Sequence, residues 1–243
     1  METEFIRINK FLSEAGVCSR RGADRLVEEG RVTIDGKVAV LGDQILPGQK
    51  VLVDGREIQR EDEKILLAFH KPKGIVCTAE KREKNNIIDY IHYPKRIYPV
   101  GRLDKDSEGL ILLTNDGELG NEILRARNFH EKEYIVTVNR PVTDEFLRGM
   151  AGGVPILDTI TRKCKVEKLD KRKIRIVLTQ GLNRQIRRMC RYLGYEVQKL
   201  KRIRIMNLTL DGIREGEYRE ITAQEWEELN HLLESSTSET VIR

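Results

Sequence analysis

Arg102 and Asp104, two residues apart beside Gly101, are the side chains of this sequence best suited to chemistry. Charged turn formers follow as far as Gly109, and an apolar run then indicates a buried strand. A carboxylate that acts as a nucleophile or a base must be ionised, and a neighbouring guanidinium favours that form. An aspartate near glycine is also a common turn residue, so this segment alone leaves both interpretations open.

Three further segments carry charged, polar or aromatic side chains that could contribute to a site. They are Lys71-Pro-Lys-Gly74, Lys132-Glu-Tyr134, and Gly181-Leu-Asn-Arg-Gln-Ile-Arg187. Each also has an ordinary structural interpretation. Lys71 follows an apolar run and is typical of a solvated turn, whereas Tyr134 is typical of a half-buried strand. Ile186 is equally typical of a protein core. The sequence lacks a Gly-x-Gly-x-x-Gly segment, a Walker loop and a His-Glu-x-x-His pair, so we expect neither a cofactor nor a metal.

The elements that must position these residues fall into two groups. Residues 1–60 predict a compact unit in which a helix over residues 9–15 ends at Gly16, Ser19 caps a second helix, and Asp35-Gly36 turns a hairpin. A polar linker follows. Residues 64–234 predict a second unit that contains strands at 65–69, 110–114, 132–138 and 174–178, a helix capped by Asn183, and a last helix that begins with a Thr222–Glu225 capping box and ends at Leu233. We expect residues 235–243 to form a disordered tail, and the pattern favours an α+β fold.

Composition narrows the classes of function. The net charge of +5 and the pI of about 9.0 favour an anionic partner. No apolar run is long enough for a membrane span, and the acidic N-terminus is unlike a signal peptide. The four cysteines and four histidines lack the spacing of a zinc site or a disulfide framework, which favours a cytoplasmic protein with reduced thiols.

These segments together resemble the RsuA-type family of ribosomal RNA pseudouridine synthases, and the chain most resembles the RluF branch, which modifies 23S rRNA. The resemblance rests on Gly-Arg-Leu-Asp104 with Asp-Ser-x-Gly-Leu, on Arg-Ile-Tyr-Pro-Val directly before that Gly, and on the three segments above. Residues 6–53 resemble the S4 RNA-binding domain. The resemblance implies an S4 domain followed by a catalytic domain, which is built on a mixed, mainly antiparallel sheet flanked by helices.

The same resemblance implies roles for the residues. Asp104 is the expected catalytic group, acting either covalently at the ribose or as a base toward C2′–H. Arg187 pairs with this carboxylate in a bidentate manner, Tyr134 stacks on the target base, and Ile186 is a wall of the same pocket. Arg102 fills the space that the extruded nucleotide leaves in the RNA, or else pairs with a phosphate or Glu108. Lys71 supports the pocket or contacts a phosphate.

The basic residues predict an RNA surface. In the segment 184–204 they far outnumber the acids, whereas bases and acids nearly cancel over residues 1–60. The expected RNA contacts are Arg20, Arg21, Arg25, Arg184, Arg188, Arg191, Lys201 and Arg202. Helix salt bridges with Asp24 and Glu28 are the alternative for the first three.

We therefore expect a monomeric pseudouridine synthase whose partner is ribosomal RNA, 23S rRNA above all, or a ribosome-assembly intermediate. One alternative is the same reaction on a different RNA, either 16S rRNA or tRNA. Another is a non-catalytic assembly factor on the same scaffold. An S4 module that mainly anchors a protein complex is a further one.

Overall fold

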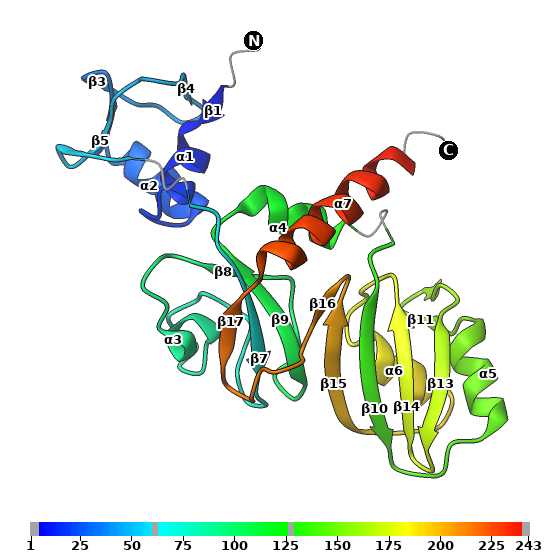
Figure 1. The fold of residues 1–243 in the computed structure, drawn as a ribbon. Coiled ribbons are helices and arrows are strands. Elements are labelled where there is room, and N and C mark those ends of the chain that lie inside the picture. Colours follow the sequence, from blue (N-terminus) through cyan, green and yellow to red (C-terminus); the bar gives the residue numbers. More distant parts are fainter. Residues whose placement is uncertain (1–4, 60–62, 126–128, 240–243) are drawn as a thin grey trace. The chain divides into compact units, whose positions relative to one another are not determined.

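The computed structural model describes residues 5–59, 63–125 and 129–239, and the side chains as far as Glu234. The chain divides into two compact units. One contains the residues up to Lys64 together with Pro94–Arg96 and Asn115–Gly117, and the other contains the rest of the chain (Figure 1). Within the described ranges, no helix is both long and apolar enough to cross a membrane.

The N-terminal unit consists of two short helices and two small sheets. The helices are α1 (Ile8–Glu14) and α2 (Arg20–Glu28). A four-stranded antiparallel sheet has the order β3 (Lys37–Val38), β2 (Val32–Ile34), β5 (Val51–Val53) and β6 (Arg56–Glu57), and β1 (Ile6–Arg7) pairs with β4 (Gln44–Ile45).

Local sequence explains both the helix cap and the hairpin turn predicted for this unit. The hydroxyl of Ser19 accepts a hydrogen bond of 3.1 Å from the backbone of Gly22, which caps α2 as expected. Asp35 and Gly36 both have positive φ angles, as a two-residue hairpin turn requires. Leu12 and Val27 are buried against Val51 of the sheet and form the centre of a separate small core.

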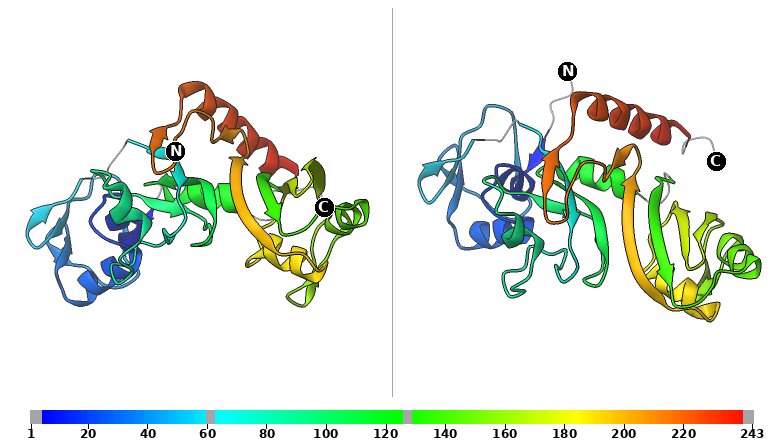
Figure 2. Two further views of the ribbon diagram at one scale, coloured as in Figure 1. Left: turned by 90° about the horizontal axis from the view of Figure 1, so that it is seen from below. Right: turned by 60° about the horizontal axis from the view of Figure 1, so that its bottom comes forward.

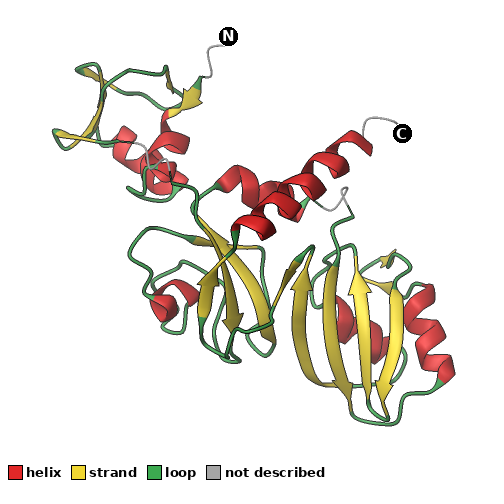
Figure 3. Ribbon diagram, viewed as in Figure 1, coloured by secondary structure: helices red, strands yellow, loops and turns green. Residues whose placement is uncertain are grey.

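The second unit is built on one nine-stranded sheet (Figure 3). Its path runs β13 (Lys165–Asp170), β14 (Lys173–Leu178), β10 (Lys132–Val138), β15 (Val197–Ile205), β9 (Glu108–Thr114), β7 (Leu66–Lys71) and β17 (Tyr218–Glu220). Two short strands join it from the side, namely β16 (Leu208–Thr209) on β15 and β8 (Tyr98–Val100) on β9. Only the β15–β9 pair of this sheet is parallel among the described strands, and it spans just two residue pairs.

Helices cover both faces of this sheet, and strand alternation explains how. In β7, Leu67 and Phe69 face one core while Leu66 and Ala68 face the other. The first core contains residues of α3 (Ile87–Ile91), α5 (Asp144–Gly152) and α6 (Gln185–Tyr192), and the second contains residues of α4 (Gly117–Leu124) and α7 (Ala223–Glu239). Figure 2 shows α7 lying along one side of the sheet. A two-stranded hairpin, β11 (Pro155–Ile156) with β12 (Thr159–Ile160), completes the unit.

The expected α+β class and the mixed, mainly antiparallel sheet are confirmed. The Thr222–Glu225 capping box is also present, with reciprocal hydrogen bonds of 3.2 and 2.8 Å. Helix α7 continues to Glu239, so the first five residues of the expected tail are helical, because each added residue of an established helix gains a hydrogen bond. Residues 240–243 lie outside the described ranges.

The expected N-cap at Asn183 is wrong. Helix α6 begins at Gln185, and Arg184 is its N-cap in a left-handed conformation with φ of 49°. Asn183 instead accepts hydrogen bonds from the guanidinium of Arg188, which lies one turn inside the helix. The loop before α6 is therefore shaped by its arginines, which also determine the site described next.

Candidate active site

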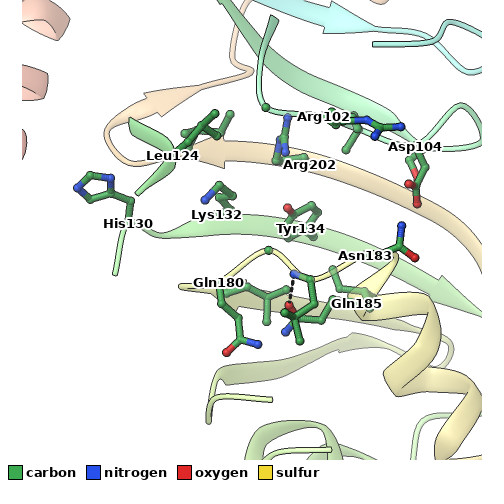
Figure 4. A pocket seen from close by; sticks show the side chains of 18 of the residues that line it. Arg102, Asp104, Leu124, His130, Lys132, Tyr134, Gln180, Asn183, Gln185 and Arg202 are labelled. Carbon is green, nitrogen blue, oxygen red and sulfur yellow. Dashed lines mark hydrogen bonds between the residues drawn. The ribbon is translucent and has the colours of Figure 1, made fainter. Parts of the chain in front are cut away.

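A cavity of about 480 Å³ opens in the second unit beside the short parallel contact between β9 and β15 (Figure 4). Its walls come from the segment 100–104, the start of β10, the loop 178–184 with the beginning of α6, and β15. Gly109 makes the close strand contact possible. Its φ is +116°, and a Cβ atom there would lie 2.2 Å from the carbonyl oxygen of Arg202.

Asp104 lines one end of this cavity with its side chain about one-third exposed. Its Oδ2 atom lies 3.5 Å from Nη1 of Arg184 and 3.9 Å from Nε of Arg187. Arg187 was expected to bind this carboxylate through two parallel hydrogen bonds, but it makes a single, longer ion-pair contact. The bidentate pair of the site joins Arg184 to Asp106, at 3.3 and 3.0 Å.

Arg187 has a different task, which is to hold the loop that carries the acids. Its Nη2 donates to the backbone carbonyl of Asp106 and to the hydroxyl of Ser107, both at 3.1 Å, and Ser107 is fully buried. Partial burial alone would raise the pKa of Asp106, but the hydrogen bond from Arg184 and the charges of both arginines bring it below its usual value. Asp106 is therefore a fixed negative charge that ties both guanidinium groups to the loop.

Buried groups behind the loop set the position of Asp104. The thiol of Cys77 lies 3.3 Å from both the backbone nitrogen and the carbonyl oxygen of Leu103, the residue between Arg102 and Asp104. Lys71 is fully buried, and its Nζ donates to the carbonyls of Pro72 and Ile75 at 2.8 and 2.9 Å. The solvated-turn interpretation of Lys71 and a contact with phosphate are both wrong, because the side chain is inaccessible. A supporting role remains, since Lys71 holds the turn 72–75, in which Gly74 donates to the carbonyl of Lys105 at 2.8 Å.

The middle of the cavity is formed by an aromatic ring and an apolar wall. Tyr134 of β10 and Ile186 of α6 both line it and are both buried. Arg102 is exposed and lines the cavity at the Asp104 end, as Figure 4 shows. The four residues named from the sequence, Arg102, Asp104, Tyr134 and Ile186, thus surround one cavity, although they come from three separate segments.

Two cations at the other end were not recognised as cavity groups from the sequence. Arg202 lies directly opposite Tyr134 in the β10–β15 pairing, and Lys132 lies two residues before Tyr134 on the same strand face. Arg202 is only 4% exposed, so the expectation that it belongs to a surface that contacts phosphates is wrong. The sequence did contain a signal for Lys132, because residues two apart on a strand lie on the same face and Tyr134 was already a candidate cavity residue.

The other basic candidates are at the surface. Arg184, Arg188 and Arg191 are exposed on or next to α6 and line a second hollow of about 310 Å³ together with Arg187. Lys201 is half-buried on β15. In the N-terminal unit, Arg20, Arg21 and Arg25 are exposed on α2, and within the described ranges none of these three forms an ion pair with Asp24 or Glu28.

Known proteins share both units. A family model described as RNA pseudouridylate synthase matches residues 65–192, and one described as S4 domain matches residues 6–51. The dual-specificity RNA pseudouridine synthase RluF of Salmonella typhi is 59% identical over 235 residues, which cover 96% of this chain and 81% of the relative. The chain belongs to the RNA pseudouridylate synthase family.

More distant members agree with this assignment. The ribosomal large subunit pseudouridine synthase B of Bacillus subtilis is 37% identical, over 93% of this chain and 96% of the relative. A solved structure, a crystal structure of pseudouridylate synthase, is 30% identical with a TM-score of 0.68, over 92% of this chain and 99% of that one. The protein is thus an RNA pseudouridine synthase with an S4 domain, and RNA is its substrate class.

Proposed function

We propose that this enzyme isomerises a uridine of 23S rRNA and that Asp104 is its catalytic carboxylate. The observation that carries the proposal is the position of that carboxylate. It borders the cavity that also contains Tyr134, within 3.9 Å of two arginines whose other contacts fix the loop. An ionised, oriented acid beside an aromatic ring is what the reaction needs from the protein.

The reaction breaks the N1–C1′ bond of uridine, turns the base and joins C5 to C1′. Its atoms balance without a redox partner, because C5 loses a proton and N1 gains one. Asp104 either attacks C1′ as the base departs or removes the C2′ proton. Arg184 and Arg187 stabilise its charge in both routes, so the geometry supports the residue without choosing the route.

The target base must leave its helix to reach Asp104. We assign Tyr134 as the ring on which the extruded uracil stacks and Ile186 as the apolar wall beside it. Arg102 is exposed next to Asp104, where a planar cation can enter the gap left in the RNA. Lys71 acts only through the loop that it supports.

We further propose how the RNA is held. Residues 1–60 are assigned as the S4 RNA-binding domain and residues 64–234 as the catalytic domain. Arg20, Arg21 and Arg25 on α2, together with Arg184, Arg188, Arg191 and Lys201, contact phosphates, because their side chains are exposed or half-buried and strongly basic. The enzyme acts as a monomer in the cytoplasm, on rRNA or on an assembly intermediate.

The choice of 23S rRNA rests on similarity to the RluF relatives and to a large-subunit enzyme. The RluF relatives are named as dual-specificity enzymes, which favours a second RNA as an additional substrate of this chain.

Two experiments test these assignments. Release of tritium from C5-labelled uridine in 23S rRNA tests the reaction, and comparing pseudouridines in rRNA and tRNA with and without the gene identifies the target. Release only from tRNA or 16S rRNA contradicts the 23S assignment.

For the S4 domain, changing Arg20 and Arg21 to Gln should flatten the salt dependence of RNA binding by about one unit per lost contact. An unchanged slope contradicts these contacts.

A further inference from the structure

The far end of the cavity holds two cations side by side. Lys132 is on β10, and Arg202 is on β15 opposite Tyr134. Both line the cavity, and Figure 4 shows Lys132 on one side of Tyr134 and Asp104 on the other. The guanidinium carbon of Arg202 lies 6.0 Å from the centre of the Tyr134 ring.

The protein leaves this positive charge unpaired. Nε of Arg202 donates to the carbonyl of Leu110 at 2.6 Å, which fixes the direction of the guanidinium, but its buried Nη2 has no hydrogen-bond partner. Within the described ranges, neither Lys132 nor Arg202 forms an ion pair with a carboxylate. Two neighbouring, uncompensated cations in a largely buried place are unfavourable unless a negative ligand completes the site.

We propose that Lys132 and Arg202 form an oxyanion site for the carbonyl oxygens of the uracil, and that they stabilise the negative charge which the base carries after its N1–C1′ bond breaks. The inference rests on the proposed function. It adds a second catalytic pair to Asp104, one that acts on the base instead of the ribose.

The chemistry of the step requires such a site. When N1–C1′ breaks, the bonding electron pair leaves with the base and spreads over N1, O2 and O4. This holds whether Asp104 bonds to C1′ or the C2′ proton is removed first. After the base turns, an electron pair from C5 forms the new bond to C1′. In the covalent route the Asp104–C1′ bond breaks at this point and frees the carboxylate, and in the other route C2′ takes back the proton that Asp104 removed. C5 then releases its proton to water, and N1 takes a proton from water. Cations that meet the oxygens stabilise the separated state more than neutral uridine, and therefore lower the barrier.

The position favours uracil over a phosphate as the ligand. RNA phosphates stay on the backbone at the cavity rim, whereas Arg202 is almost fully buried. Arg202 and Tyr134 are paired across the strands and share a face, and the guanidinium carbon lies 6.0 Å from the ring centre, so a base stacked on that ring is next to the guanidinium.

The test separates chemistry from RNA binding. Lys132→Met and Arg202→Gln should each lower the single-turnover rate of tritium release at saturating RNA by about 10²-fold, with a Kd for RNA within about threefold of the wild type. Matched controls are Lys171→Met, in the exposed β13–β14 turn, and Arg148→Gln, exposed on α5; both should keep the wild-type rate. A weaker Kd with an unchanged rate identifies a phosphate contact and overturns the proposal.

A leaving-group comparison excludes a merely structural defect. Fluorine at C5 withdraws electrons and stabilises the uracil anion by itself, so the variants should lose about tenfold less in the rate of N1–C1′ cleavage on 5-fluorouridine RNA. C5 of this substrate has no proton to release, so the change in the ¹⁹F signal when the N1–C1′ bond breaks is followed instead of tritium. Equal losses on both substrates contradict the proposal. If Arg202→Gln does not fold, Lys132→Met alone tests the proposal, because the Lys132 side chain is only half-buried and its replacement disturbs the fold less. A wild-type enzyme that releases no tritium contradicts the proposed function instead.

Discussion

At one end of the cavity, Asp104 lies within 3.9 Å of two arginines that also hydrogen-bond to Asp106 and Ser107 of the same loop, whereas at the other end Lys132 and Arg202 have no carboxylate partner in the described part of the chain. At the first end the protein supplies both the carboxylate and its opposite charges, so the acid is positioned before RNA arrives, although Nε of Arg187 makes no hydrogen bond to the described residues. The second end is completed only by a ligand. The contrast teaches that a pre-arranged acid and an incomplete cation pair can share one cavity because they act on different parts of one nucleotide.

The largest effect should come from removing the charge at the first end. Asp104→Asn keeps the shape of the side chain but cannot act as nucleophile or base, so the rate of tritium release should fall at least about 10³-fold. RNA affinity, measured by filter binding, should remain near that of the wild type. Activity that survives this change removes Asp104 from the mechanism.

The two arginines of that end should differ in importance. Arg187→Gln loses contacts to the buried Ser107 and to the Asp106 backbone, so the rate should fall about 10²-fold. Arg184→Gln loses an exposed pair with Asp106 and should reduce the rate only about tenfold. Single-turnover rates at saturating RNA measure both losses. A larger loss for Arg184→Gln than for Arg187→Gln contradicts the positioning role of Arg187.

The contact between the strands that hold the two ends can be broken at Gly109. An alanine there meets the Arg202 carbonyl and requires a φ that alanine rarely adopts, so Gly109→Ala should lower the free energy of unfolding by about 3 kcal/mol. Gly152→Ala is the control, because a Cβ atom there has no neighbour within 4 Å. Denaturant unfolding measures both, and equal stabilities would show that the strand contact adapts.

The smallest expected effect concerns how far the unpaired charge of Lys132 lowers the free energy of unfolding. Burial, and next the charge of Arg202, lower the pKa of Lys132 from 10.5 to about 8, so the folded protein disfavours the charged form. Lys132→Met should therefore be more stable than the wild type by about 1 kcal/mol at pH 7, a rise of about 3 °C in Tm.

The sign of the pH dependence follows from the two pKa values. Below about pH 8, Lys132 is charged in both the folded and the unfolded states, and the destabilisation is complete. It fades as the pH rises from 8 to 10.5, and above 10.5 the side chain is neutral in both states. The advantage of Lys132→Met should shrink over that range. The neighbouring His130 does not titrate over that range, because burial holds its pKa below the usual value; the hydrogen bond with the Ile123 carbonyl opposes this shift, and the charge of Lys132 adds to it. Thermal unfolding between pH 7 and pH 10 measures the difference, and a constant difference contradicts the role of charge.

Local pattern was enough for much of the fold. Ser19 as an N-cap, Asp35-Gly36 as a turn and the alternation in β10 depend on neighbours within a few residues, so they could be predicted. The start of α6 could not, because Arg184 and Arg188 bind Asp106 and Asn183 instead of leaving Asn183 as the cap. Tertiary contacts there override the local preference.

For the site, the amino-acid sequence by itself determined which side chains are present and which segments carry them: Asp104 beside Arg102, Tyr134 on an alternating strand, and Arg187 on a basic helix. Only the tertiary structure decided the distribution of charge. It buried Lys71, turned Arg187 toward the loop backbone and placed Arg202 against Tyr134. The physical reason is that β9 and β15 are far apart in sequence and touch over two residue pairs, and no local pattern records which residues such a contact brings together.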